Sequence, residues 1–452
     1  MSYKYDLVVV GGGPGGLEAA QRAAKAGKRV LIMEKTGWGG TCTHRGCIPT
    51  KALLTCSKYY ADLKKLKRLG INLSSAAFDF TAMKKHQQQM VKVAALGAQK
   101  TLADARVEIK VGTGEILSPH ELKFTDQAGS SQMISTGSIV IAWGSKPQVL
   151  SGVDLSGRIL TSDGILNLNT LPGSIAVVGG SFIGVEFATF FAELGVKVTL
   201  LELMDNILPQ EDEEAAGFLK QELIRAGVAV HNSTRLNCLK ETDSGVTIQV
   251  QNNSGQMEWN MDYVLLCTGR KPNLNEAELI NSGIAYDQTG IKVDTNMMTN
   301  VPGIYAAGDV TGGMMLAHRA AQQGKVAAAN ICGYEAPPYN ESFIPSVVYS
   351  HPPIARVGMT ASQAEAEGLT IETIKSTYGA NVIARTELAG QGFVKALFHD
   401  DKLIGVTIIG HHASELIASM SLALANGLSR RQLQSWVIPH PTLSEIFLSI
   451  FS

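Results

Sequence analysis

Two cysteines near the N-terminus lie five positions apart, in the segment Gly39-Gly40-Thr41-Cys42-Thr43-His44-Arg45-Gly46-Cys47. Free cysteines usually behave as small buried hydrophobic residues. Here, however, Arg45 and Lys51 supply positive charge, which favours the thiolate, and the thiolate is the form that exchanges with disulfides. The flanking glycines and charges therefore favour a redox-active pair, Cys42 and Cys47, over two structural thiols.

A glycine-rich turn precedes this pair and has the composition of a dinucleotide site. The apolar run Tyr5–Val10 predicts a buried strand that leads into the turn, and a small-residue helix follows. In such a turn Gly11 allows the tight bend, Gly13 lets backbone approach a pyrophosphate, and Gly16 packs helix against strand. Glu34 ends the next predicted strand, where a carboxylate would accept from ribose hydroxyls.

The same unit recurs 168 positions later (179 − 11 = 168). Its turn glycine, packing glycine and acid are Gly179, Gly184 and Glu202. Ser181 replaces the middle glycine, so a side chain stands where backbone would approach a ligand. Glu202 suits a free ribose 2′-hydroxyl and repels a 2′-phosphate, and no arginine follows it in Leu203–Ile207. The sequence thus predicts two different dinucleotide sites, the second for NAD rather than NADP.

Composition argues against several other functions. The chain has 452 residues and a net charge of −1, so it offers no basic field for nucleic acid or an anionic membrane. It contains no apolar run of about 18 residues, the length that predicts a transmembrane helix. The N-terminus lacks a secretory signal pattern, and six cysteines in so long a chain do not form a disulfide framework. We therefore expect a cytoplasmic protein in which any disulfide is catalytic.

Several motifs make the chain resemble the pyridine nucleotide–disulfide oxidoreductases over essentially its whole length. They are Gly39–Leu54, Gly269–Asn273, Thr299–Asp309, Met315–His318, Tyr349–Pro352 and His440–Glu445. Within this family they are most similar to the members that oxidise dihydrolipoamide. The resemblance implies an α/β fold with two Rossmann-like dinucleotide-binding domains and a C-terminal α+β dimerisation domain, with FAD and NAD as cofactors.

The resemblance also implies roles for individual residues. The catalytic residues would be Cys42, Cys47, His440, Glu445, and Lys51 paired with Glu186 near the flavin. The residues in contact with FAD would be Gly11, Gly13, Gly16, Glu34, Gly40, Thr41, Lys51, Gly114, Gly144, Asp309, Met315, Leu316, Ala317 and His318. Those in contact with NAD would be Gly179, Ser181, Gly184, Glu186, Glu202 and Gly269.

The implied reaction begins at a base from the opposite subunit. His440, oriented by Glu445, would deprotonate dihydrolipoamide, and the resulting thiolate would attack Cys42. Cys47, nearest the flavin, would then pass electrons to FAD and on to NAD. The resemblance thus implies a homodimer, with a lipoyl-bearing 2-oxoacid dehydrogenase E2 or glycine-cleavage H protein as a candidate partner.

Two alternatives remain open at this point. One is a related NAD(P)H-dependent reductase of glutathione or another small disulfide, and the other is a non-catalytic flavin-stabilised scaffold. Retention of both cysteines, His440 and Glu445 argues against the scaffold. Two positions depart from the family pattern, since Ile438 stands where a histidine is common and Trp143 where a threonine is usual.

The repeat also sets the expected domain limits. We expect an FAD-binding domain at 1–145 and 272–342, an NAD-binding domain at 146–271, and a dimerisation domain at 343–452. No metal site is expected, because His411 and His412 are adjacent, and adjacent side chains diverge on a strand or helix. The other cysteines, Cys56, Cys238, Cys267 and Cys332, are expected to be buried free thiols.

Overall fold

The computed structural model describes residues 3–452, so Met1 and Ser2, part of the N-terminus examined for a signal pattern, lie outside the described residues. The chain forms two compact units. The first comprises the chain up to Ala52, Lys84–Gln148 and Gly269–Glu341, and the second comprises Leu53–Met83, Val149–Thr268 and Ser342–Ser452. The predicted NAD-binding and dimerisation segments thus belong to one compact unit, and the exact limits of three domains stay a prediction.

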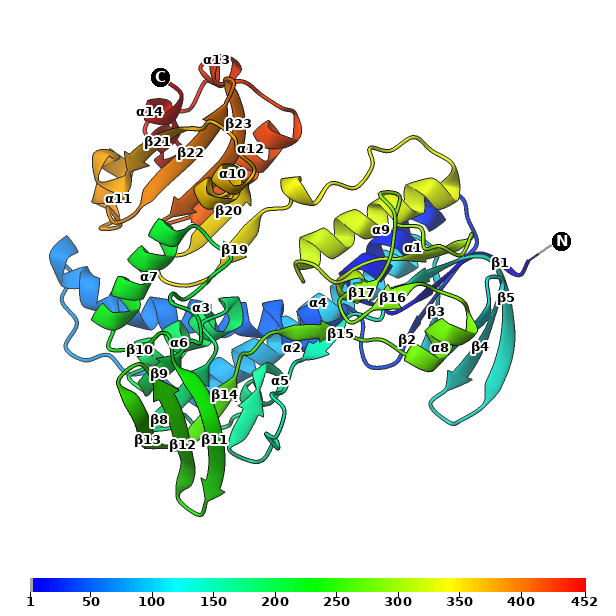
Figure 1. Ribbon diagram of the computed structural model, residues 1–452, viewed down its shortest axis with the longest axis horizontal. Helices are drawn as coiled ribbons and strands as arrows, with labels where there is room; N and C mark the ends of the chain where they lie inside the picture. Colours follow the sequence, from blue (N-terminus) through cyan, green and yellow to red (C-terminus); the bar gives the residue numbers. More distant parts are fainter. Residues whose placement is uncertain (1–2) are drawn as a thin grey trace. The chain divides into compact units, whose positions relative to one another are not determined.

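A parallel sheet in the order β3-β2-β1-β5-β18 forms the centre of the first unit (Figure 1). β4 pairs antiparallel with β3 and β5. The strands are β1 Tyr5–Val10, β2 Val30–Glu34, β3 Glu108–Ser118, β4 Glu121–Asp126, β5 Ser131–Ile141 and β18 Ile304–Ala306. Leu7, Val8 and Val9 of β1 are fully buried, as expected for a parallel strand covered on both faces.

Helices α1 (Pro14–Lys25) and α9 (Ala317–Cys332) lie side by side in the first unit (Figure 1). Their close approach requires Gly324, where a Cβ would lie 2.2 Å from the carbonyl oxygen of Gly15. Other elements with residues in this unit are α2 Gly40–Arg45, α3 Cys47–Asp62, α4 Phe80–Asp104, β6 Ser145–Pro147, β15 Arg270–Pro272, α8 Glu276–Asn281, β16 Tyr286–Asp287, β17 Gly290–Ile291 and η2 Asp309–Thr311. Across residues 3–452, no helix has both the length and the apolarity to cross a membrane.

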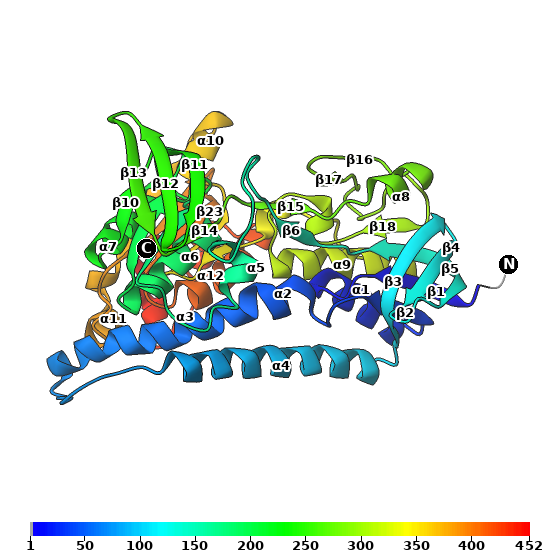
Figure 2. The ribbon, with the colours of Figure 1, turned by 90° about the horizontal axis from the view of Figure 1, so that it is seen from below.

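The second unit contains a parallel sheet in the order β10-β9-β8-β14-β7. Its elements are β7 Ile159–Thr161, α5 Ser162–Ile165, β8 Ser174–Val178, α6 Phe182–Glu193, β9 Lys197–Leu201, α7 Glu213–Arg225, β10 Ala229–His231 and β14 Tyr263–Leu266. Figure 2 shows the adjacent antiparallel strands β11 Arg235–Thr242, β12 Gly245–Asn252 and β13 Gly255–Met261.

The cysteines outside the redox pair only partly match the expectation. Cys267 is buried, whereas Cys56 and Cys332 are partly buried. Cys238 is exposed, so the expectation of a buried thiol was wrong there. It lies on β11, an edge strand, where the register with β12 shifts between Leu236 and Cys238. Such an irregularity redirects side chains away from simple alternation.

The C-terminal segment of the second unit is built on an antiparallel sheet in the order β19-β20-β23-β22-β21, with α12 packed on β20 and β23. Its strands are β19 Ser346–Val348, β20 Ile354–Gly358, β21 Glu372–Thr377, β22 Phe393–His399 and β23 Lys402–Ile409. Its helices are α10 Ala361–Ala366, α11 Val382–Thr386, α12 Ala413–Ala425, α13 Arg430–Leu433 and α14 Leu448–Phe451. Short 3-10 turns are η1 Leu63–Leu69, η3 Glu341–Phe343, η4 Tyr378–Ala380 and η5 Leu443–Phe447.

Two buried ion pairs tie the start of α7 to this C-terminal segment. Oε2 of Glu211 lies 2.8 Å from Nε of Arg356, and Oδ2 of Asp212 lies 2.6 Å from Nζ of Lys395. Asp212 also caps α7 by accepting from the N–H of Ala215 at 3.1 Å. All four charged side chains are largely shielded from solvent. The acidic residues Glu211 and Asp212, directly before α7, therefore join two segments of the unit.

Packing glycines in the second unit give a direct test of this fold. A Cβ at Gly184 would lie 1.9 Å from the carbonyl oxygen of Gly179, whereas one at Gly217, also helical, would meet no atom within 4 Å. Gly184→Ala should lower the free energy of unfolding by about 2–3 kcal/mol, because backbone must move. Gly217→Ala, the matched control, should raise it by about 0.5–1 kcal/mol. Denaturant unfolding measures both, and equal effects would contradict the described packing.

Candidate active site

The two cysteines of the predicted redox pair lie on consecutive helices, with Cys42 in α2 and Cys47 at the start of α3. Gly39, which precedes α2, has the left-handed φ of 95° that favours glycine. Both cysteines are partly buried free thiols, and a hydrogen bond joins their side chains. Two thiols close enough to share a hydrogen bond fit a redox-active disulfide.

The surroundings of Cys42 oppose its ionisation. The hydrogen bond with Cys47 raises the pKa of the Cys42 thiol most, and burial raises this pKa further. The positive charge of Lys51 lowers the same pKa, whereas the negative charge of Asp309 raises it. The first unit therefore places Cys47, Lys51 and Asp309 close enough to Cys42 to change the pKa of its thiol. With only this chain's groups around it, Cys42 in the dithiol form stays protonated at neutral pH.

The first glycine turn has the tight backbone contacts that the sequence predicts. A Cβ at Gly11 would lie 2.1 Å from the carbonyl oxygen of Ala142, and one at Gly16 would lie 2.0 Å from that of Gly11. Oε2 of Glu34 accepts from the N–H of Gly12 at 2.7 Å. A carboxylate oxygen has a second lone pair, so this oxygen can also accept from a ribose hydroxyl.

The space beside this turn suits the pyrophosphate of FAD. A Cβ at Gly13 would meet no atom within 4 Å, so backbone at the N-terminus of α1 borders open space. Helix N-termini bind phosphate through their unpaired N–H groups. A Cβ at Gly40 would lie 2.8 Å from Cα of Gly13, so the start of α2 lies directly against the turn. The residues present therefore fit the predicted cofactor and bring its site close to the thiol helix.

A hydrogen-bond chain fixes Asp309, the acid predicted to contact FAD. Oγ of Ser145 donates to Oδ2 of Asp309 at 2.6 Å, and Nε of Arg270 donates to Oγ of Ser145 at 2.8 Å. Sequence reasoning used Arg270 as part of a motif but missed Ser145. The sequence did contain a signal for Ser145, because this residue directly follows Gly144, which is predicted to contact FAD.

The remaining residues predicted for FAD also lie in the first unit. They are Thr41 in α2, Gly114 in β3, Gly144 after β5, Met315 and Leu316 directly before α9, and Ala317 and His318 in its first turn. A Cβ at Gly114 would lie 2.6 Å from Sδ of Met33, so packing also requires this glycine. His318 is exposed. Their contacts with FAD stay predictions.

The second glycine turn repeats the geometry of the first despite its serine. A Cβ at Gly179 would lie 2.5 Å from the carbonyl oxygen of Cys267, and Glu202 accepts from a backbone N–H of the turn at 2.6 Å. Oγ of Ser181 donates to the carbonyl of Cys267 at 2.9 Å and accepts from the N–H of Gly184 at 3.4 Å. Ser181 therefore caps α6 with its hydroxyl turned toward protein backbone, and the turn is preserved.

Of two further residues predicted for NAD, Glu186 lies in the second unit and Gly269 belongs to the first. Glu186 is buried in α6, and its Oε1 accepts from the N–H of Tyr349 at 3.1 Å. Gly269 has a φ of 101°, which favours glycine, and directly precedes β15. Lys51 and Glu186 belong to different compact units, so their predicted pairing stays a prediction.

The predicted base and its orienting acid contact each other in the second unit. Nδ1 of His440 lies 2.8 Å from Oε1 of Glu445, and Oε2 of Glu445 accepts from the N–H of Thr442 at 3.0 Å. These two hydrogen bonds, that of His440 first, lower the pKa of Glu445. The acid is therefore a carboxylate at neutral pH, and the His440 side chain, 76% exposed, is presented to the outside of the chain.

The two residues that depart from the family pattern, Trp143 and Ile438, both pack against apolar cores. Trp143 packs, partly buried, against an apolar core of the first unit, and its carbonyl accepts from Nδ2 of Asn273 at 3.0 Å. Ile438 packs, partly buried, against the core of the C-terminal segment. Each side chain therefore has a structural reason for its apolar character.

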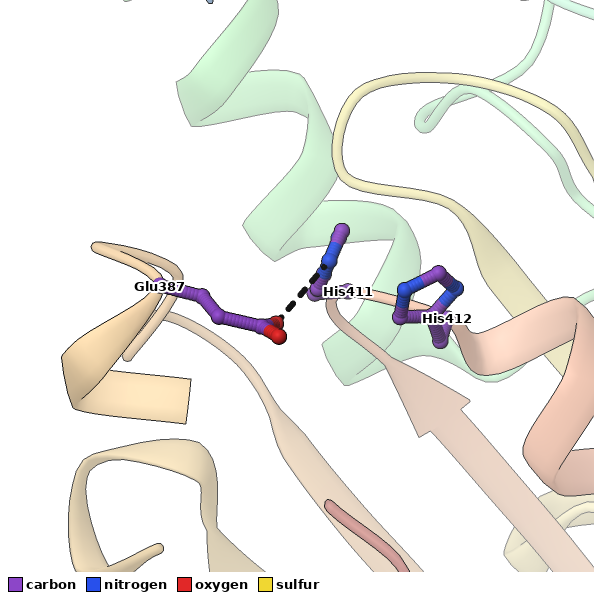
Figure 3. Close-up of side chains that lie close together, drawn as sticks. All are labelled: Glu387, His411 and His412. Atoms are coloured by element: carbon purple, nitrogen blue, oxygen red, sulfur yellow. Dashed lines mark ion pairs between the residues drawn. The ribbon is translucent and has the colours of Figure 1, made fainter. Parts of the chain in front are cut away.

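The histidines His411 and His412 do not diverge, so the geometric reason given against a metal site was wrong. Their ring centroids are 3.9 Å apart, because the φ of 58° at His412 turns the chain. Figure 3 shows Glu387 beside His411, with Oε2 and Nε2 3.2 Å apart. Burial, then the charges of His412 and Lys58, lower the pKa of His411. The nearby cation Lys58 disfavours a metal ion, and the expected absence of a metal stays a prediction.

Comparisons with known proteins agree with this geometry. Residues 5–324 match the pyridine nucleotide-disulphide oxidoreductase family, and residues 344–449 match its dimerisation domain. A dihydrolipoyl dehydrogenase of Chlamydia pneumoniae is 37% identical over 99% of this chain and 96% of its own. The structure of LpdA from Mycobacterium tuberculosis superposes with a TM-score of 0.92 at 28% identity, covering 98% of each chain. The flavoprotein disulfide reductase RclA from Escherichia coli superposes with a TM-score of 0.84 at 28% identity, covering 98% of each chain.

The chain belongs to the pyridine nucleotide–disulphide oxidoreductase family and carries its dimerisation domain. The predicted α/β fold class, the oxidoreductase activity and the cofactors of this family, FAD and NAD, are confirmed. The thiol pair of Cys42 and Cys47 fits the redox-active disulfide of such a flavoprotein.

The pKa of Cys42 can be tested by alkylation of the dithiol form. In enzyme reduced with dithiothreitol, iodoacetamide should modify Cys42 slowly below its ordinary pKa of about 8.5 and faster only at higher pH. Cys47→Ala removes the contact that raises the pKa of Cys42 most, so it should speed modification at pH 7. Peptide mass spectrometry gives the rates, with exposed Cys238 as the internal reference. Equal rates at pH 7 in both proteins would contradict this account.

Proposed function

We propose that this protein oxidises dihydrolipoamide to lipoamide with NAD, through a Cys42–Cys47 disulfide and bound FAD. The similarity to dihydrolipoyl dehydrogenases over 99% of the chain, at 37% identity, carries this proposal. The adjacent thiols and the exposed His440–Glu445 pair supply the groups that such a reaction needs. We also propose the domain limits, the individual cofactor contacts and the Lys51–Glu186 pair given above for this function.

The protein's residues divide the reaction between a base and a thiol pair. Glu445 accepts from Nδ1 of His440, which leaves Nε2 as the atom that takes a proton from the substrate thiol. The resulting thiolate attacks Sγ of Cys42, the Cys42–Cys47 bond breaks, and Cys47 leaves as a thiolate. Nε2 of His440 gives that proton to solvent and takes the proton of the second substrate thiol. The sulfur of this thiol then attacks the substrate sulfur of the mixed disulfide, which releases lipoamide and the thiolate of Cys42. FAD supplies the two-electron acceptor that restores the disulfide, and NAD supplies the final hydride acceptor.

An exposed base on the dimerisation domain favours a homodimer as the working form. The His440 side chain is 76% exposed, and Val437, three positions earlier, is 88% exposed. An apolar side chain so exposed beside a catalytic base suits burial against another copy. We propose that His440 serves the thiol pair of the opposite subunit. The cytoplasmic location and a lipoyl-bearing E2 or H protein as the dithiol donor are proposals of the same kind.

The alternative function is NAD(P)H-dependent reduction of glutathione or another small disulfide. Glu202 disfavours the 2′-phosphate of NADPH, and the two residues after it, Leu203 and Met204, are exposed and uncharged. The deciding measurement compares NAD with NADP as acceptor for dihydrolipoamide, and oxidised glutathione as an alternative substrate for NADH or NADPH. Turnover of glutathione with NADPH above that of dihydrolipoamide with NAD would reject the proposal.

Loss of one thiol should separate the two halves of the reaction. Cys47→Ser should abolish dihydrolipoamide turnover, because no disulfide can form, while NADH-to-dye electron transfer continues through the flavin. Cys238→Ser, at an exposed cysteine outside the site, is the matched control and should retain both activities. Steady-state assays of both reactions check this division. If Cys47→Ser lost both activities equally, with flavin still bound, the division would be wrong.

Loss of the base should affect the thiol half alone. His440→Gln should lower the rate of dihydrolipoamide oxidation by about 10²–10⁴, the usual contribution of general acid–base catalysis. His399→Gln, in the same domain, controls for loss of a histidine elsewhere. NADH-to-dye activity should be unchanged in both variants. A His440→Gln enzyme within about tenfold of the wild-type rate would remove His440 from the mechanism.

A further inference from the structure

The loop that carries His440 is held together by its own hydrogen bonds. Oγ1 of Thr442 donates to the carbonyl of Pro439 at 2.8 Å, and the N–H of Thr442 donates to Oε2 of Glu445 at 3.0 Å. Nδ1 of His440 lies 2.8 Å from Oε1 of Glu445. Pro439–Glu445, the histidine loop, is therefore bonded within itself, and its position fixes that of the imidazole.

Asn381 ties the histidine loop to the rest of the domain. Its Nδ2 donates to the carbonyls of Thr442 at 3.1 Å and Leu443 at 3.3 Å. Its Oδ1 accepts from the N–H of Ala384 at 3.0 Å, which caps α11. The side chain is 7% exposed, so these carbonyls are held by a donor that water hardly reaches. An amide has two N–H donors, and each has one carbonyl here.

The segment around Asn381 is fixed in the apolar core. Tyr378 is fully buried, and its hydroxyl donates to the carbonyl of His411 at 2.8 Å. Ala384 is fully buried in the same core, as are Ile446 and Phe447 at 3% and 0% exposure. Asn381 therefore stands on a rigid support and bonds directly to the loop whose base is otherwise exposed.

We infer that Asn381 is a positioning residue for the His440–Glu445 pair, holding the histidine loop so that the imidazole meets the substrate thiol in one orientation. The inference rests on the proposed role of His440 as base. In this scheme Asn381 touches neither substrate nor cofactor and acts through His440. A base must lie within hydrogen-bond reach of the proton it removes, so a displaced loop slows proton transfer.

Two substitutions in the holoenzyme separate loop positioning from helix capping. Asn381→Ser keeps an oxygen able to cap α11 but loses the two amide donors, whereas Asn381→Ala loses both functions. Both should lower kcat for dihydrolipoamide by about 10- to 100-fold, with NADH-to-dye activity unchanged. KM for dihydrolipoamide should stay near the wild-type value, because Asn381 does not touch the substrate.

Ser429→Ala is the matched control. Ser429 caps α13 in the same segment by accepting from the N–H of Gln432 at 3.2 Å, and it is not in the histidine loop. Its loss should lower stability slightly and leave kcat unchanged. If Asn381→Ser had the wild-type kcat while Asn381→Ala did not, only capping would matter and the inference would be overturned.

A double variant shows whether Asn381 acts through His440. In His440→Gln enzyme, Asn381→Ser should add little further loss, because a positioning residue loses its effect when the residue it positions is gone. A further loss as large as in the wild-type background would overturn the inference. If His440→Gln alone retained the wild-type rate, the proposed base would fail instead, so the two failures are distinguishable.

Discussion

The redox centre depends on the close approach of two stretches of backbone, at Gly13 and Gly40. A Cβ on Gly40 would lie 2.8 Å from Cα of Gly13, and Gly40 has a left-handed φ of 58°. A side chain at Gly40 would push the helix of Cys42 away from the nucleotide turn, and one at Gly13 would fill the space beside it. The proposed sulfur chemistry and the proposed dinucleotide binding therefore depend on the same backbone contact. If this contact were lost, Cys42 would also move relative to Asp309.

The two dinucleotide units share this turn but use it differently. In the first unit the N–H of Gly39 donates to the carbonyl of Gly12 at 2.8 Å, and the chain continues into the helix of Cys42. In the second, the N–H of Leu208 donates to the equivalent carbonyl of Gly180 at 2.8 Å, and the chain continues toward α7. The thiol helix thus occupies the place at which the second unit has an ordinary connection. One repeated frame thus leads into the helix of the thiol pair in one copy and into an ordinary connection in the other.

Features that depend on local backbone could be predicted from the sequence, and features that depend on distant contacts could not. A Cβ at Gly16 would clash with the carbonyl oxygen of Gly11, only five positions earlier, so the spacing of these two glycines alone indicates the turn. The hydroxyl of Ser181 turns toward Cys267, which is 86 positions away, and Asn381 holds Thr442, which is 61 positions away. No pattern within a window of sequence contains such pairs. The positive φ of His412 likewise had no signal, because nothing in its residue type requires it.

The buried pairs Glu211–Arg356 and Asp212–Lys395 affect how such a chain can be recombined. Each pair joins a residue before α7 to one on the C-terminal sheet, and a partner left alone would be an uncompensated buried charge. The two segments also share an apolar core that includes Leu219, Phe393 and Ile409. A chimera that took only one segment from a relative would have to keep both charges and that core complementary. The segment before α7 and the C-terminal sheet would therefore have to be exchanged together rather than one at a time.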